Sequence, residues 1–427
     1  MTKASKIRRI ISMILIVGVV GCSFGLISES SKQKEYGEDF AEIQNIKYGL
    51  LNVTKWKEKI ADIVVKKVEG FKLTTGNKDF LRVNIESILN SYLDTLLVEL
   101  RGDVNSETDL LPWIGAGLKS FAAEAAVDLF GVKKQIPKFT DAIIEQIESN
   151  ETTANLKAFI IQQFNDQAQG TSGLASYELY NSILAKYNST SSGECAQEIS
   201  TQMKRVNQRM NLYTLIILGS AIMVLFLLLF RVGNVPRIDF LLLSIITLLL
   251  LTIAVITPMM EIDVRIDKFS FLLMGEKVEF NDQILFYKSK SIFEVVRLLF
   301  LSMTLQSIIV GILILLFSIV FPVLKIVSTL VVAFNQKMAT NKFIHFFAFK
   351  SGKWSMADVF VVAMFMSFLG LEGVISSQLE DLELHSEAMG IITANHSVFG
   401  VGFLFFVAFT IMGIIVSTKL SKNQNTK

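Results

Sequence analysis

Residue types that mark metal sites, disulfide frameworks and catalytic clusters are scarce in this chain of 427 residues. Its two cysteines, Cys22 and Cys195, lie far apart and form no CxxC pair, so neither a disulfide framework nor a zinc ribbon is indicated. Only three histidines occur, and none is spaced as a metal or catalytic cluster. The net charge of +2 gives no signal for nucleic-acid binding. Because no nucleophile, base and orienting group can be assembled, the sequence predicts no enzyme, cofactor or metal site.

Apolar residues are abundant instead. They make up 51% of the chain, with 33 phenylalanines, which is too apolar for a soluble protein of this length and predicts a multi-pass membrane protein. Six transmembrane helices are predicted, at 10–27, 211–230, 239–257, 307–327, 356–376 and 397–417. The expected fold class is an all-α membrane protein with a large extracytoplasmic helical domain and a small β-hairpin in an outer loop.

Residues 1–28 combine a basic start with an apolar run just long enough to span a bilayer. Two interpretations remain open for this segment. The sequence from Val19 to Cys22 resembles a bacterial lipoprotein signal, which would be cleaved before Cys22 and acylated there. A retained signal-anchor helix is the simpler account, because the hydrophobic run continues beyond Cys22 to Ile27.

Residues 29–207 are more polar, and their apolar residues recur at helical spacing. Amphipathic helices are predicted at 117–130, 138–149, 152–168 and 173–188, among others. We expect an α-helical domain large enough to bury its own core. Nothing after Cys195 breaks a helix, so the last helix of this domain should run into the second span, and 208–237 then comprises that span and a cytoplasmic turn.

The remaining segments are a four-span module at 238–420 and a tail at 421–427. Pro258 should end the third span, and a strand-like loop after it suggests the hairpin. The apolar stretch that follows is too long for one crossing, so we divide it into an interfacial lead-in at 291–306, a crossing at 307–327 and a surface segment. Pro322 should kink the crossing helix, and Lys325 lies near its inner end, where it can snorkel.

Loop charges predict the orientation of the spans. The segments 1–9, 231–237, 335–353 and 418–427 carry four, two, four and three basic residues and no acidic ones. The alternate short loops are neutral to acidic. By the positive-inside bias both termini are cytoplasmic, and residues 29–207 are extracytoplasmic.

The stretch Gly352–Phe360 carries a dense set of candidate residues. Ser355 and Asp358 have the spacing of a capping box in front of an apolar run. Trp354 and Lys353 suit a membrane interface. We expect Lys325 and Lys353 to form a polar cluster with Asp358, including an ion pair between Lys325 and Asp358.

Three stretches resemble the paraquat-inducible protein A family of bacterial inner-membrane proteins. They are Thr257-Pro258, the run from Ser318 to Lys325 (SIVFPVLK) and the run from Gly352 to Phe360 (GKWSMADVF), and the resemblance covers about 238–420. It implies a role in the bacterial envelope beside MCE-type tunnel proteins, which move lipids between membranes. The chain departs from many relatives in lacking CxxC pairs, in having one copy of the module and in carrying Glu372 in place of a cation.

The resemblance implies an integral inner-membrane component of envelope lipid transport or homeostasis, with membrane lipids and an MCE-type protein as partners. In this hypothesis the module forms a cavity open to the outer leaflet or the periplasm. One alternative is a small-molecule or ion transporter that uses Asp358, Lys325 and Glu372 as a relay, although no inverted repeat is evident. Another is a membrane scaffold or stress sensor. The candidate functional residues are Pro258, Pro322, Lys325, Lys353, Trp354, Ser355, Asp358 and Glu372.

Overall fold

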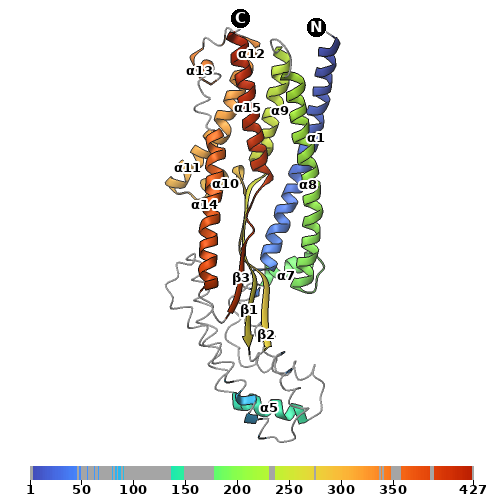
Figure 1. Cartoon of the computed structure of the whole chain (residues 1–427), viewed down its shortest axis with the longest axis vertical. Helices are drawn as coiled ribbons and strands as arrows, with labels where there is room; N and C mark the ends of the chain where they lie inside the picture. The colour runs from blue at the N-terminus through green and yellow to red at the C-terminus, as the bar shows by residue number, and fades with distance from the viewer. Residues whose placement is uncertain are drawn as a thin grey trace.

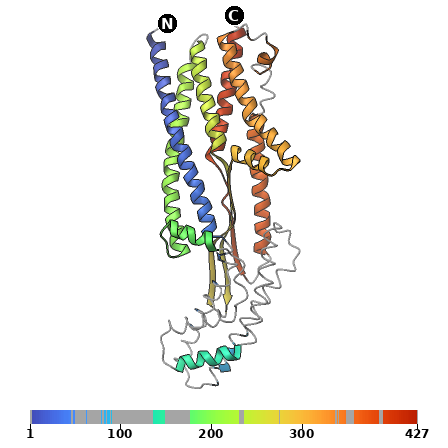
Figure 2. The same cartoon turned by 180° about the vertical axis from the view of Figure 1, so that it is seen from behind.

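The computed structural model describes residues 3–45, 48–49, 136–148, 177–229, 236–273, 276–335, 338, 341–347, 357–384 and 389–425, with scattered single positions from 55 to 90. The described part is an elongated helical bundle with a β-sheet extending from one end (Figure 1). Both termini lie at the other end of the bundle (Figures 1 and 2). The side of a membrane on which the two termini lie stays a prediction.

Two long helices, α1 (Lys3–Ile43) and α8 (Ser192–Leu229), run side by side along the bundle (Figure 2). Each is longer than the roughly 20 residues that a membrane crossing requires. The prediction that α8 continues without a break into the second span is confirmed. The helix α1 likewise continues past residue 28. Beyond the apolar part, α7 (Tyr177–Lys186) packs against α1 and joins it through Lys186, which binds Glu35 at 2.6 Å.

The helix α9 (Arg237–Ile256) is the centre of the bundle. It is the most deeply buried of the five helices that are long and apolar enough to cross a membrane. A helix that is hydrophobic on all sides is expected in such a buried position. It ends at Thr257, directly before Pro258, as the sequence predicts. The last helix, α15 (Val401–Asn425), packs along it.

The long apolar stretch after the sheet forms a lead-in helix and a crossing helix, as predicted. The lead-in is α10 (Ile292–Leu301), which begins with a capping box between Ser291 and Glu294. The helix is continuous over Leu305–Phe334, so it contains both the predicted crossing at 307–327 and the segment that we expect near the far surface. Its parts are α11 (Leu305–Leu315), the π-helical turn η2 (Leu316–Val320) and α12 (Phe321–Phe334). The π-turn ends at Val320, two positions before Pro322, whose ring disturbs regular α-helical bonding in the preceding turn.

The sheet corrects the expectation of an all-α fold. The predicted hairpin is present, but β1 (Pro258–Leu273) and β2 (Glu276–Ser291) each have 16 residues, so it is not small. The strand β3 (Met389–Asn395) pairs with the other edge of β1, and β4 (Val398–Phe399) pairs with β1 near Met260. Both strands lie in a part of the chain where we expected a loop followed by the start of the sixth span. Pairing with β1 holds these residues extended, so α15 begins at Val401 rather than at residue 397.

The predicted fifth span corresponds to α14 (Ala357–Leu384), whose described apolar part, Val359–Val374, is shorter than the roughly 20 residues that a membrane crossing requires. The described residues therefore contain five candidate spans, and the sixth remains a prediction. Of the predicted amphipathic helices, 138–149 corresponds to α5 (Ile136–Glu148) and 173–188 to α7. The other two, 117–130 and 152–168, lie outside the described residues.

Candidate functional site

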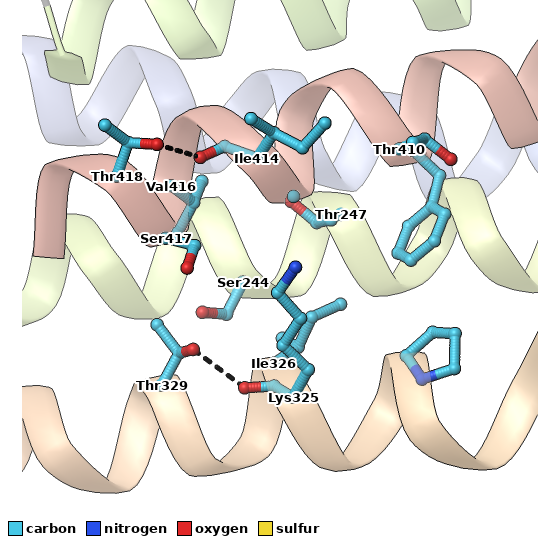
Figure 3. A pocket seen from close by; sticks show the side chains of 13 residues that line it. Ser244, Thr247, Lys325, Ile326, Thr329, Thr410, Ile414, Val416, Ser417 and Thr418 are labelled. Carbon is cyan, nitrogen blue, oxygen red and sulfur yellow. Dashed lines mark hydrogen bonds between the residues drawn. The ribbon is translucent and has the colours of Figure 1, made fainter. Parts of the chain in front are cut away.

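A cavity of about 320 Å³ lies between α9, α12 and α15 (Figure 3). Its lining includes Ser244 near the start of α9 and Thr418 near the end of α15, which places it in the half of the bundle that holds the termini. This volume is at the lower end of the range of small-molecule sites. The lining residues are Ser244, Thr247, Pro322, Lys325, Ile326, Thr329, Phe409, Thr410, Gly413, Ile414, Val416, Ser417 and Thr418.

Lys325 supplies the positive charge of this cavity. Pro322, Lys325 and Thr329 are spaced three to four residues apart on α12, so one face of that helix presents all three to the cavity. The Lys325 side chain extends from α12 so that its amine nitrogen lies among the side chains of Ser244 and Ser417 (Figure 3). None of the 13 described lining residues is acidic. Among the described lining residues, Lys325 is therefore the one charged group.

Hydroxyl groups from all three helices line the cavity. Four threonine hydroxyls donate to the carbonyl four residues earlier: Thr247 to Leu243 at 2.7 Å, Thr329 to Lys325 at 2.7 Å, Thr410 to Phe406 at 2.9 Å and Thr418 to Ile414 at 2.8 Å. These bonds use the single proton of each hydroxyl but leave oxygen lone pairs that can accept.

Ser244 differs from the threonines. It is only 1% exposed, and its Oγ has no hydrogen-bond partner among the residues that the structure describes. A buried hydroxyl without a partner costs about 1–3 kcal/mol, and native proteins rarely leave one unsatisfied. Ser244 therefore has a proton to donate to a group in the cavity. We did not predict this residue, although two polar residues three positions apart in an otherwise apolar span, Ser244 and Thr247, were a visible signal.

A buried ion pair lies at the same end of α9. The Nε atom of Arg9 in α1 donates to Oδ1 of Asp239 in α9 at 2.6 Å, and the two side chains are 9% and 6% exposed. In this pair the positive charge of Arg9 compensates the negative charge that Asp239 would otherwise place near the cavity. In the sequence, Arg9 stands out only as an orientation charge, and we did not predict a role for Asp239, although an acidic residue beside an apolar span is itself unusual.

The opposite end of α9 carries the junction with the sheet. Pro258 follows the C-cap of α9 and is the first residue of β1, so the prediction that the helix ends at this proline is confirmed. Close to it, burial raises the pKa of the Glu261 carboxyl, and the nearby charge of Asp263 raises that pKa further. The cavity around Lys325 lies toward the termini, and the expected cavity open to the outer leaflet or the periplasm stays a prediction.

The other candidate residues are not gathered at this cavity by the described structure. Glu372 is exposed on α14. Asp358 lies in the first turn of α14, but its side chain is outside the described part, so its ion pair with Lys325 stays a prediction. Lys353, Trp354 and Ser355 also lie outside the described residues, as does the capping box that we expect there.

Part of the chain matches a known protein family. Residues 282–380 match the model of the family described as paraquat-inducible protein A. The matched segment runs from β2 into α14 and includes Pro322 and Lys325 of the cavity. No curated protein sequence and no solved structure matches the chain. The match supports the family resemblance for residues 282–380, within a chain whose described part has five helices long and apolar enough to cross a membrane.

Proposed function

We propose that this protein is an integral component of the bacterial inner membrane that serves envelope lipid transport or lipid homeostasis. It would act with an MCE-type protein on its extracytoplasmic face. The observation that carries this proposal is the coincidence of the family match with the polar cavity, since Pro322 and Lys325 belong to both. A polar cavity inside a bundle of apolar helices is costly unless it has a ligand or a transport role.

The orientation in this proposal has both termini in the cytoplasm, α14 as the fifth of six spans, and residues 29–207 in the periplasm. It is supported by the position of both termini at one end of the bundle and by the basic residues of the segments at that end. The sheet and α7 lie at the other end, where a periplasmic partner would bind.

The surface of the crossing helix also favours contact with lipid. The stretch Leu305–Phe334 is the least buried of the five candidate spans, and apolar side chains such as Leu305 and Ile309 are exposed on it. Exposed apolar side chains on a membrane helix face acyl chains or a partner protein. The short helix α10 buries Ile292 and Val296 and exposes Phe293, as expected for a helix at the membrane interface.

The proposal is tested by lipid transfer with purified components. The full-length protein is reconstituted into liposomes that contain a fluorescent phospholipid, and transfer to a soluble MCE-type protein encoded in the same genome is measured. We expect transfer that requires the full chain and falls in the Lys325→Gln variant. The Lys342→Gln variant, altered at an exposed lysine in the short helix Lys342–His345, is the matched control. Absence of transfer with both proteins correctly folded would contradict the proposal.

A second candidate function is transport of a small molecule or ion, which the polar cavity with Lys325 and several hydroxyl groups also favours. It predicts uptake of a soluble small molecule or ion into sealed liposomes without any MCE-type protein. The scaffold alternative predicts instead that residues 29–207 on an unrelated anchor restore a deletion strain. Lipid transfer without uptake into sealed liposomes, and without restoration of the deletion strain by residues 29–207, would favour the proposed function over both alternatives.

A further inference from the structure

We infer that the segment 291–311, which contains α10, the turn at Met303 and the start of α11, is a lipid-docking elbow. Its tip at Met303 inserts among the acyl chains of the membrane leaflet on the side of the sheet, and Arg297 binds the phosphate group of a lipid in that leaflet. The inference deepens the proposed function by naming an element that contacts lipid. It rests on the proposed function only for the orientation in which this leaflet is the outer one.

The elbow lies at the level of a membrane surface. It projects sideways from the bundle where the sheet begins (Figures 1 and 2). Its first residue, Ser291, pairs with Pro258, which follows the C-cap of α9. Because α9 has 20 residues, about the length of one crossing, this end of α9 and the adjacent Ser291 lie near one face of the bilayer. The elbow then leads into Leu305–Phe334, which is long and apolar enough to cross the membrane.

The tip of the elbow carries exposed apolar side chains. Met303 is 79% exposed and Leu305 is 74% exposed, and these are the two most exposed large apolar side chains among the residues that the structure describes. Leu301, on the other side of the turn, is exposed as well. Leu305 lies one helical turn from the exposed Ile309, so the tip is continuous with the apolar surface of the crossing helix. Transfer of this surface from water into acyl chains is favourable.

The backbone at Met303 is strained. Its φ of 55° lies in the left-handed region, where glycine is the usual residue and any other side chain costs free energy. The helix ends on both sides fix this turn, because the Ser302 N–H donates to the Leu298 carbonyl and the Thr304 side chain accepts from the Ser307 N–H. Strain that the surroundings fix is concentrated at functional positions. Here it holds a long apolar side chain at the tip, as insertion into a leaflet requires.

Packing holds the elbow in one arrangement. Val296 of α10 is buried in the core of the bundle. A Cβ atom at Gly311 would lie 3.2 Å from the Cβ of Leu299, so α10 and α11 approach each other closely. Glu294 in the first turn of α10 forms an ion pair with Lys34 of α1. A contact surface that is already ordered loses little conformational entropy when it binds.

Arg297 supplies the contact with the lipid head groups. It lies one helical turn from both Phe293 and Leu301, and all three side chains are exposed on α10. Arg297 has no ion-pair partner among the residues that the structure describes. A guanidinium group can extend past apolar side chains toward the head groups, and it binds phosphate oxygens in a bidentate manner. Phosphate is common to phospholipids with different head groups, so the elbow should bind phospholipids as a class.

Site-directed spin labelling of the full chain in phosphatidylglycerol liposomes tests the position of the tip. A nitroxide is attached at Met303→Cys in a background without other cysteines, and its collision rates with oxygen and with a water-soluble nickel chelate are compared. The oxygen-to-nickel ratio should be several-fold higher than at Asn181→Cys, exposed on α7, and lower than at Leu313→Cys, deeper in the crossing helix. Leu305→Cys should give a ratio close to that of Met303→Cys and serves if that variant unfolds. A ratio as low as at position 181 would overturn insertion.

Native mass spectrometry of the purified full-length protein tests the role of Arg297. The protein is titrated with phosphatidylglycerol, with phosphatidylcholine, and with a diacylglycerol of the same acyl chains, which has no phosphate. Arg297→Gln should lose several-fold in binding of both phospholipids and nothing in binding of diacylglycerol, whereas Arg297→Lys should keep part of the phospholipid binding because it keeps the charge. Lys342→Gln, at an exposed lysine in the helix Lys342–His345, should bind all three as the parent does. Unchanged phospholipid binding in Arg297→Gln would overturn this role.

The results separate the elbow from the proposed function. Lipid transfer by a protein whose position 303 is as accessible to water as position 181 would refute the elbow and leave the proposed function standing. Insertion of the tip, with phospholipid binding that depends on Arg297, in a protein that transfers no lipid would do the reverse. Melting temperatures in detergent show that each variant is folded before its lipid contacts are compared.

Discussion

Arg9 and Asp239, which are 230 positions apart in the sequence, form an ion pair at 2.6 Å between α1 and α9, with both side chains almost fully buried. Removing one partner leaves the other charge buried and uncompensated, which costs about 3–5 kcal/mol. We therefore expect Arg9→Gln to lower the melting temperature of the detergent-solubilised protein clearly, whereas Arg8→Gln, at an exposed neighbouring position, should have little effect.

The double variant Arg9→Met with Asp239→Leu provides the matching control for this pair. Apolar replacement of both partners is often close to neutral for stability. Its melting temperature should therefore lie nearer to that of the parent than does that of Arg9→Gln. A double variant as unstable as the single one would show that packing at these positions, and not the paired charges, determines stability.

The junction of α15 with β1 depends on Gly400. A Cβ atom at this position would collide with the backbone carbonyl of Pro258. Overpacking of this kind costs about 1–3 kcal/mol, so Gly400→Ala should lower the melting temperature. Gly370→Ala in α14 is the control, because a Cβ there meets nothing within 4 Å. In a helix interior that change should be neutral or stabilising.

Glu261 should make the stability of the protein depend on pH. Its pKa is raised by burial and by Asp263, so the folded state holds its proton more tightly than the unfolded state does. Stability should then be greatest below the ordinary glutamate pKa and fall as the pH rises from there through the raised pKa. Denaturant titrations across this pH range should show that the free energy of unfolding falls less steeply with rising pH in Glu261→Gln than in the parent protein.

A second glutamate on the sheet gives a comparison of opposite sign. The pKa of Glu279 is lowered by its hydrogen bond with Lys277 and by Lys268. Its contribution to stability is present above the ordinary glutamate pKa and is lost as the pH falls through the lowered pKa. Glu279→Gln should therefore change the pH profile in the opposite direction to Glu261→Gln. Profiles that change in the same direction would refute the assignment of burial as the cause at Glu261.

The predicted ion pair between Lys325 and Asp358 can be tested by a double-mutant cycle. If the two side chains interact, the effects of Lys325→Gln and Asp358→Asn on the free energy of unfolding should be coupled by about 0.5–3 kcal/mol. The same cycle with Glu372→Gln in place of Asp358→Asn is the control, since Glu372 is exposed further along α14. Additive effects for Lys325 and Asp358 would rule out the pair.

Local signals in the sequence predicted several element boundaries correctly. Pro258 ends α9, and the uninterrupted helix formers after Cys195 allow α8 to continue into an apolar span. The lead-in helix α10 is likewise separate from the crossing helix. These features depend on proline geometry, helix capping and hydrophobic length, which act within a few residues of each other.

The strand β3 was missed because its signal is not local. Its seven residues are held extended by pairing with β1, more than a hundred residues earlier in the chain. A short strand of this kind has no periodicity that distinguishes it from a loop. The length of the hairpin was underestimated for a related reason, since β1 is stabilised on both of its edges.

The sequence by itself determined that this protein is built of apolar membrane helices, that its loops are charged asymmetrically, and that it carries a paraquat-inducible protein A segment. Hydrophobic length, charge distribution and motif order are properties of the chain alone. Only the tertiary structure brought Ser244, Lys325 and Ser417 together from three helices and paired Arg9 with Asp239. Burial gives these polar groups their significance, and burial depends on which helices pack together.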